Sequence, residues 1–136
     1  MARRVVVEIG EAPVPQHSYG GLLVIECTTG FSVRRTSDNS EGVSTAAHCD
    51  NPQVLQKHST NLVFVAAAYR GSQDVQWHIT PGLTDPNVIN DRVSTNPREI
   101  TGRIDRSQMT VGDTVCKSGR TSGYGCGTIK NQEQGV

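Results

Sequence analysis

The chain has 136 residues, 35% of them hydrophobic and 4% aromatic, which is enough for one hydrophobic core and leaves little room for two. It carries 13 Lys and Arg against 13 Asp and Glu, so its formal net charge is zero. A neutral chain has no field that attracts polyanions, and we expect neither a nucleic-acid nor a membrane partner. Val, Ile and Thr together outnumber Leu several-fold, a balance that favours strands and excludes an all-α protein.

The first 19 residues are expected to form an N-terminal arm or linker. They contain Pro13 and Pro15 and a short β-like run at Val5–Ile9. Residues 1–4 have the positive start of a signal peptide, but the apolar stretch behind them is too brief and no small-residue cleavage site follows. We therefore expect no signal peptide in this chain.

Eight later segments combine β-branched residues with flanking turn formers, which is the pattern of short strands. The segments predicted as strands are Leu22–Cys27, Gly30–Arg35, Gly42–Ala47, Leu62–Tyr69, Asp74–Thr80, Ile100–Ile104, Thr114–Lys117 and Gly127–Lys130. The turns predicted between them are Ser37–Ser40, Pro81–Gly82, Asp85–Asn87 and Gly123–Gly125. Residues 81–97 are predicted as the longest loop. The spacing of the strands is typical of a β-barrel or a β-sandwich.

The four cysteines are an even number that could close two disulfides in an oxidising compartment. They are Cys27, Cys49, Cys116 and Cys126, and three pairings are possible. Pairing neighbours in sequence would close two loops of ordinary length, and each disulfide would add roughly 2–4 kcal/mol of stability. The residues alone leave the pairing open.

A zinc site is the alternative use of these side chains. Cys27, His48, Cys49 and His58 offer suitable ligand atoms. However, the chain has no C-x2-C or H-x3-H pair that would supply two ligands from one turn. We therefore expect no metal and no other cofactor.

The segment Val43–Cys49 is the most informative part of the chain. Its small residues let a strand end close to another backbone. The adjacent Cys49 can staple that end to Cys27, which would hold the imidazole of His48 as general-base catalysis requires. Asp74 begins a predicted strand with apolar neighbours, so we expect its carboxylate to be buried and to need a partner. His48 would serve as that partner. Asp85 and Asp91 also follow His48, but they lie in turn-like sequence where a carboxylate normally faces water, which favours Asp74.

The string Thr45-Ala46-Ala47-His48-Cys49 resembles the T-A-x-H-C motif of the chymotrypsin-like serine proteases. Residues 27–33 and 115–129 are similar to the secreted bacterial branch of that superfamily, the streptogrisin and alpha-lytic type. The resemblance implies an all-β fold, with a first antiparallel β-barrel over residues 20–108 and the opening hairpin of a second barrel over residues 109–136. It also implies a secreted protein with a polypeptide substrate. Because a pro-segment precedes the mature barrel in such proteases, the resemblance offers a pro-segment remnant as the alternative interpretation of residues 1–19.

The same resemblance assigns roles to individual residues. It implies a disulfide between Cys27 and Cys49 and a second disulfide between Cys116 and Cys126. It implies that His48 is the general base of a serine endopeptidase, with Asp74 as the acid that orients it.

The nucleophile of that family is a serine in G-D-S-G-G, and this chain has no such string. Gly112-Asp113-Thr114 comes nearest but has no following Gly-Gly, and we expect it to be a turn. Ser118 and Ser122 precede glycines inside the expected second hairpin, upstream of the family's nucleophile. We therefore expect that the chain stops before the serine and is inactive alone. Its incomplete second barrel would expose apolar surface and strand edges that favour self-association. The alternative is a non-catalytic, protease-like binding or scaffold module.

Overall fold

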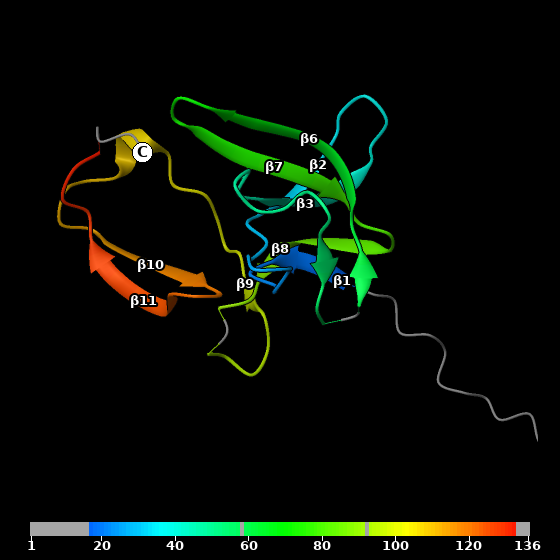
Figure 1. Cartoon of the computed structure of the whole chain (residues 1–136). Helices are drawn as coiled ribbons and strands as arrows, with labels where there is room; N and C mark the ends of the chain where they lie inside the picture. The colour runs from blue at the N-terminus through cyan, green and yellow to red at the C-terminus, as the bar shows by residue number, and fades with distance from the viewer. Residues whose placement is uncertain (1–16, 58, 92, 133–136) are drawn as a thin grey trace, which may run out of the picture.

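A computed structural model describes residues 17–57, 59–91 and 93–132 of the chain (Figure 1). The β-like run at Val5–Ile9, most of the expected arm, and His58 lie outside the described residues. The elements are β1 (His17–Gly20), β2 (Ser32–Arg34), β3 (Glu41–Thr45), β4 (Val54–Leu55), β5 (Thr60–Asn61), β6 (Val63–Arg70), β7 (Gln73–Ile79), β8 (Leu83–Ile89), β9 (Arg98–Glu99), the short 3₁₀ turn η1 (Arg106–Gln108), β10 (Thr114–Gly119) and β11 (Gly123–Thr128). The expected all-β class is confirmed.

The strands form two main sheets, a small pair and a separate hairpin. One sheet has the order β2-β3-β7-β6 with antiparallel neighbours, and the other has the order β1-β8-β9. The two sheets pack on each other through β1, β2, β3 and β8, as expected for a barrel (Figure 1). In the second sheet β1 runs parallel to β8, a local departure from the antiparallel barrel that the resemblance implies.

The hydrophobic core lies between these sheets and the β4–β5 pair. It is small, and its buried members are Tyr19, Leu22, Val24, Val43, Leu55 and Leu62. Each large apolar side chain buried in this way contributes roughly 1.5–3 kcal/mol. Many polar side chains are buried beside them, among them Thr45, Gln76 and His78. Because buried polar groups need partners, the interior of this fold depends on hydrogen bonds as well as on apolar packing.

Several strand predictions are confirmed and two are wrong. The predicted strands at residues 42–47, 62–69, 74–80 and 114–117 correspond to β3, β6, β7 and β10. Leu22–Cys27 is instead a tight loop, because Glu26 adopts a left-handed backbone with φ of 58° and the N–H of Val24 bonds the carbonyl of Cys27. Ile100–Ile104 is also irregular, since the adjacent pairing with β8 ends at Glu99.

Strand β8 was expected to be part of a loop because Asp85, Pro86 and Asn87 are turn formers. The structure corrects this. The register between β1 and β8 shifts at the position of these residues, so Pro86 lies in an irregularity where a missing N–H costs no ladder bond. Asp85 is held by the ring of His17 at 2.7 Å and by the hydroxyl of Ser32, which donates to its carbonyl. Residues 17–19, expected in the arm, thus belong to β1.

The hairpin of β10 and β11 pairs only with itself among the described residues. Its loop falls at residues 120–122, so the predicted turn at Gly123–Gly125 is wrong, and Gly123, with φ of 63°, closes the loop at the start of β11. The tip of the hairpin contacts the loop between β1 and β2, where the backbone N–H of Arg120 donates to the hydroxyl of Thr28 and its guanidinium donates to the carbonyl of Val24. Val115 and Tyr124 on the hairpin are exposed. Self-association through this surface stays a prediction, as do the domain boundaries.

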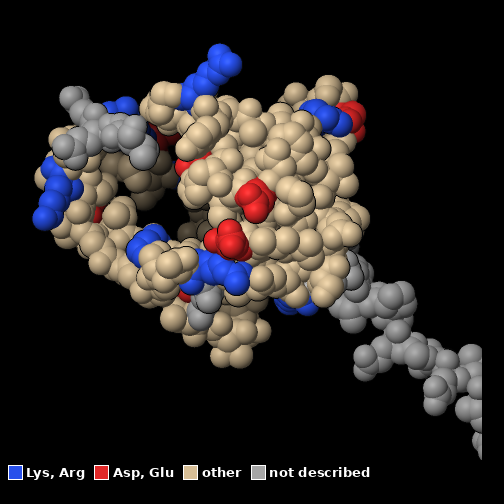
Figure 2. All heavy atoms as spheres, in the orientation of Figure 1, with Lys and Arg blue, Asp and Glu red and all other residues tan. Residues whose placement is uncertain are grey.

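The distribution of charged side chains on the surface is consistent with the zero net charge of the chain (Figure 2). On the face shown in Figure 2, Lys and Arg side chains lie among Asp and Glu, and the face is hollowed between the β10–β11 side and the rest of the molecule. Across the described ranges, none of the helical segments has the length and apolar character needed to cross a bilayer.

Gly42 allows β3 and β7 to approach closely. A Cβ atom at this position would lie 1.9 Å from the carbonyl oxygen of His78. We expect Gly42→Ala to lower the free energy of unfolding by about 1–3 kcal/mol, because the two backbones must move apart. Chemical denaturation followed by the fluorescence of Trp77 would measure this loss. Gly102→Ala is the control, since a Cβ there meets nothing within 4 Å; equal losses in both variants would contradict the explanation.

Candidate active site

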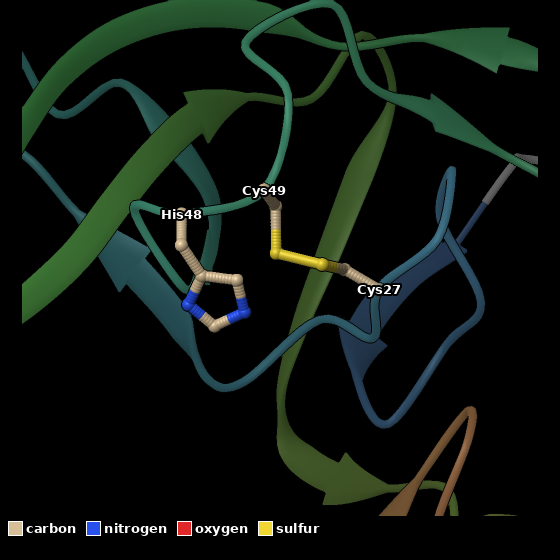
Figure 3. Close-up of side chains that lie close together, drawn as sticks. All are labelled: Cys27, His48 and Cys49. Atoms are coloured by element: carbon tan, nitrogen blue, oxygen red, sulfur yellow. A yellow bond between two sulfur atoms is a disulfide. The ribbon is translucent and has the colours of Figure 1, made fainter.

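His48 lies in a tight turn that follows directly after β3. The turn is closed by the N–H of Cys49, which donates to the carbonyl of Ala46 at 3.2 Å. Cys49 is buried and forms a disulfide with Cys27, so the end of the turn is anchored to the neighbouring loop. Figure 3 shows the imidazole of His48 beside this disulfide. The turn and the disulfide thus hold His48 at the end of β3.

Asp74 reaches the same place from β7. In the antiparallel register of β3 and β7, Thr45 pairs with Gln76, so β3 ends opposite that residue. Side chains alternate along a strand, and Asp74 therefore shares a face with Gln76 and lies two residues beyond the end of β3. The turn after Thr45 consequently folds over the carboxylate of Asp74.

Both oxygens of the Asp74 carboxylate contact His48. Oδ2 lies 2.6 Å from the ring nitrogen Nδ1, and Oδ1 accepts the backbone N–H of His48 at 2.9 Å. Two contacts to one residue fix both the position of the backbone and the plane of the ring. The His48 side chain is nevertheless 60% exposed, so the rest of the imidazole is open to solvent.

These hydrogen bonds keep Asp74 ionised. The bond from the His48 ring lowers the pKa of Asp74 most, partial burial opposes it, and the backbone N–H and the charge of His48 lower the pKa further. An ionised carboxylate only accepts hydrogen bonds, so the proton of a neutral His48 ring must sit on Nδ1. The second ring nitrogen, Nε2, is then left with a free lone pair, as a general base requires.

The expectation that Asp74 is buried is wrong. Its side chain is 34% exposed, and its strand neighbour Val75 is exposed as well. This part of β7 extends past the end of β3, which covers the strand only as far as Gln76. The carboxylate is satisfied by His48 while remaining in contact with solvent.

The two other candidate carboxylates have partners of their own. Asp85 contacts the ring of His17 at 2.7 Å. Asp91 was expected to face water but is buried, where it accepts the N–H groups of Val93 and Ser94. Asp74 is the acid that the fold brings to His48.

The disulfides follow the pairing that the resemblance implies. Cys27 is joined to Cys49, and Cys116 is joined to Cys126 across the hairpin. Nδ1 or Nε2 of His48 and the sulfurs of Cys27 and Cys49 lie within 4.8 Å of one another, a spacing that could suggest a metal site. Sulfur atoms bonded to each other are not thiolates, however, and they offer a metal no anionic ligand.

The segments that came nearest to a nucleophile motif in the sequence have other hydrogen-bond partners than His48 in the structure. Gly112 and Asp113 form the expected turn, in which the carboxylate of Asp113 accepts both the N–H and the hydroxyl of Thr110. Ser118 donates its hydroxyl to the carbonyl of Asp91 at 2.9 Å. The described residues therefore supply a His–Asp pair without a serine hydrogen-bonded to it.

Two residues that were not predicted from the sequence support the site. Gln76 is buried and donates to the turn that carries His48, and His78 is buried beside it and contacts the Gln76 amide. Their alternation with Asp74 along one strand is the signal that could have placed them on the same face.

The chain is similar to Streptogrisin-C of Streptomyces griseus. The two are 31% identical over an alignment of 113 residues, which covers 81% of this chain and 23% of Streptogrisin-C. The chain thus spans less than a quarter of the length of this relative. No family model matches the chain, and no solved structure matches it significantly. The similarity supports a distant relationship to the chymotrypsin-like serine proteases, and the two disulfides are consistent with an oxidising, extracellular compartment.

Proposed function

We propose that this chain carries the general base and the orienting acid of a secreted serine-type endopeptidase of the streptogrisin and alpha-lytic type. The observation that carries the proposal is the two-point contact of Asp74 with His48, at 2.6 Å to the ring and 2.9 Å to the backbone. The T-A-x-H-C motif around His48 and the similarity to Streptogrisin-C support the same assignment.

In this role His48 moves one proton in two steps. As a serine hydroxyl oxygen attacks the carbonyl carbon of a peptide bond, Nε2 of His48 takes the hydroxyl proton. It then gives that proton to the leaving amine as the C–N bond breaks and the acyl-enzyme forms, and water repeats the sequence to release the acid. Asp74 keeps the proton on Nδ1 beforehand and stabilises the imidazolium while it exists.

We propose that the serine and the oxyanion-hole amides come from sequence that this chain does not contain, because G-D-S-G-G does not occur in its 136 residues. A triad that lacks one member retains only roughly 10³–10⁴-fold acceleration over water, and this remainder depends on the oxyanion hole. The chain alone is therefore expected to have no measurable peptidase activity.

The test is the reactivity of the purified chain towards a fluorophosphonate probe and a mixed peptide library. We expect neither labelling nor hydrolysis. The His48→Ala variant is the control for chance reactivity. Robust labelling that disappears in this variant would show that a serine within the chain is activated, and it would overturn the proposal that the nucleophile lies elsewhere.

A second candidate is a non-catalytic binding module, which the missing G-D-S-G-G string favours. The coding sequence beyond Val136 separates the two. An in-frame G-D-S-G-G supports the endopeptidase, whereas a stop codon at that point in an expressed gene favours the binding module and counts against the endopeptidase.

A further inference from the structure

A glutamine lies beneath the turn that carries His48. Gln76 is 1% exposed, and its side-chain Nε2 donates to the carbonyl of Ala46 and to the carbonyl of Cys49, both at 2.8 Å. These two carbonyls stand at the beginning and the end of the turn, on either side of His48. A single amide group therefore ties both ends of the turn to β7.

The orientation of the Gln76 amide follows from its partners. Both backbone groups are acceptors, so the NH₂ end of the side chain must face them, and both of its protons are used. Its oxygen, Oε1, then faces Nε2 of His78 at 3.1 Å. Oε1 can only accept, so the proton of the neutral His78 ring sits on Nε2.

His78 suits this arrangement because it is held neutral. The side chain is fully buried, and burial lowers its pKa. Its other nitrogen, Nδ1, has no hydrogen-bond partner among the described residues, as expected for a bare lone pair rather than for a buried N–H. His78 therefore donates to Gln76, and Gln76 donates to the carbonyls of the turn.

The network begins on β7, the strand that holds Asp74. Asp74, Gln76 and His78 alternate along one face of β7. Asp74 contacts His48 directly, while Gln76 contacts the residues that flank it. One strand, β7, therefore positions both the turn and the carboxylate of Asp74, as a contact of 2.6 Å between Asp74 and His48 requires.

We propose that Gln76 is a positioning residue, which holds the Ala46–Cys49 turn so that both oxygens of Asp74 reach His48. Its meaning for catalysis rests on the proposed function. Its effect on the contact between Asp74 and His48 does not, and that contact can be measured in the chain as it stands.

The test replaces Gln76 in the full chain and follows Asp74. Gln76→Met keeps the length of the side chain and removes both donors. Gln76→Glu keeps the acceptor for His78 but puts an anion against two carbonyls. In either variant the pKa of the Asp74 carboxyl, followed by ¹³C NMR titration, is expected to rise towards its ordinary value of 3.8. The resonance of the hydrogen-bonded proton on His48 Nδ1 is expected to broaden or disappear.

Gln73→Met is the matched control, because Gln73 is an exposed glutamine on the same strand. It should leave the titration of Asp74 unchanged. A folded Gln76→Met variant with an unchanged Asp74 titration would overturn the proposal, since a merely structural role would leave the pKa of Asp74 where it is. The new charge in Gln76→Glu raises the pKa of Asp74 by itself, so that variant is judged by the His48 Nδ1 proton, and an unchanged resonance there would also overturn the proposal.

A measurement on the unmodified chain keeps the proposal testable if both variants fail to fold. Both Nε2 protons of Gln76 should exchange with solvent much more slowly than those of Gln73, and fast exchange would overturn the proposal. These outcomes are separate from those of the proposed function. A reactive serine in the chain, or a gene without G-D-S-G-G, would leave the positioning of His48 by Gln76 intact.

Discussion

Replacing Cys27 and Cys49 together with alanine is expected to lower the free energy of unfolding by about 3 kcal/mol. The disulfide closes a loop with a sequence separation of 22, and the chain-entropy model assigns a loop of that length a stabilisation of about 3 kcal/mol. Cys49 is buried, and Cys27 packs against the core, so the variant also loses apolar contacts. Because the core has few large apolar side chains, this disulfide is a large share of the stability of the fold.

The measurement is chemical denaturation followed by the fluorescence of Trp77, the single tryptophan of the chain, which lies in β7. The double alanine variant of Cys116 and Cys126 is the control. That disulfide joins register partners on adjacent strands of a hairpin that pairs only with itself among the described residues. Its loss should therefore change the transition reported by Trp77 much less. An unchanged midpoint in the Cys27 and Cys49 variant would contradict the expectation.

The sequence was most informative in segments where neighbouring residues form a recognisable motif or strand pattern. In the motif around His48, small residues let the strand end close to another backbone, and the cysteine anchors the turn. The structure places the histidine at the end of β3 beside the Cys27–Cys49 disulfide. Strands β6 and β7 were also predicted from the sequence, as residues 62–69 and 74–80. In these segments the local preference and the final fold agree.

Other features depend on contacts that a local pattern does not contain. Strand β8 includes Pro86 and is recognisable only once its irregular pairing with β1 is known. The Leu22–Cys27 run has the composition of a strand, but a left-handed Glu26 turns it into a loop. The roles of Gln76 and His78 depend on which backbone carbonyls lie above β7, and this follows from the register of β3 against β7. In each of these cases the backbone conformation or strand register of the folded chain, and not the local sequence, determines the outcome.

The same distinction explains why Asp74 was the right carboxylate for a partly wrong reason. Burial was expected to single it out, yet Asp91 is the more buried of the two. Asp74 is the partner of His48 because of its position on β7, next to the turn that follows Thr45. A carboxylate at a sheet end can be half exposed and still hold a histidine firmly, because both of its oxygens bond to the same residue.

Changing Asp74 to asparagine should have the largest effect on catalysis. In a form of the protein that also contains the G-D-S-G-G segment, we expect Asp74→Asn to lower kcat by about 10⁴-fold. An asparagine keeps the shape of the side chain, but its NH₂ group can donate to Nδ1 of His48. The ring proton then moves to Nε2, where it blocks acceptance of the serine proton. Steady-state hydrolysis of a peptide substrate would measure the loss.

The chain itself offers a matched control and a direct view of the cause. Asp85→Asn makes the same substitution in a second His–Asp contact, that with His17 at 2.7 Å, and should leave kcat unchanged. In the 136-residue chain, ¹⁵N NMR should place the ring proton of His48 on Nδ1, and on Nε2 in Asp74→Asn. If kcat in Asp74→Asn stays within about tenfold of the parent value, an oriented His48 is not the general base, since the loss expected for a wrong tautomer is far larger.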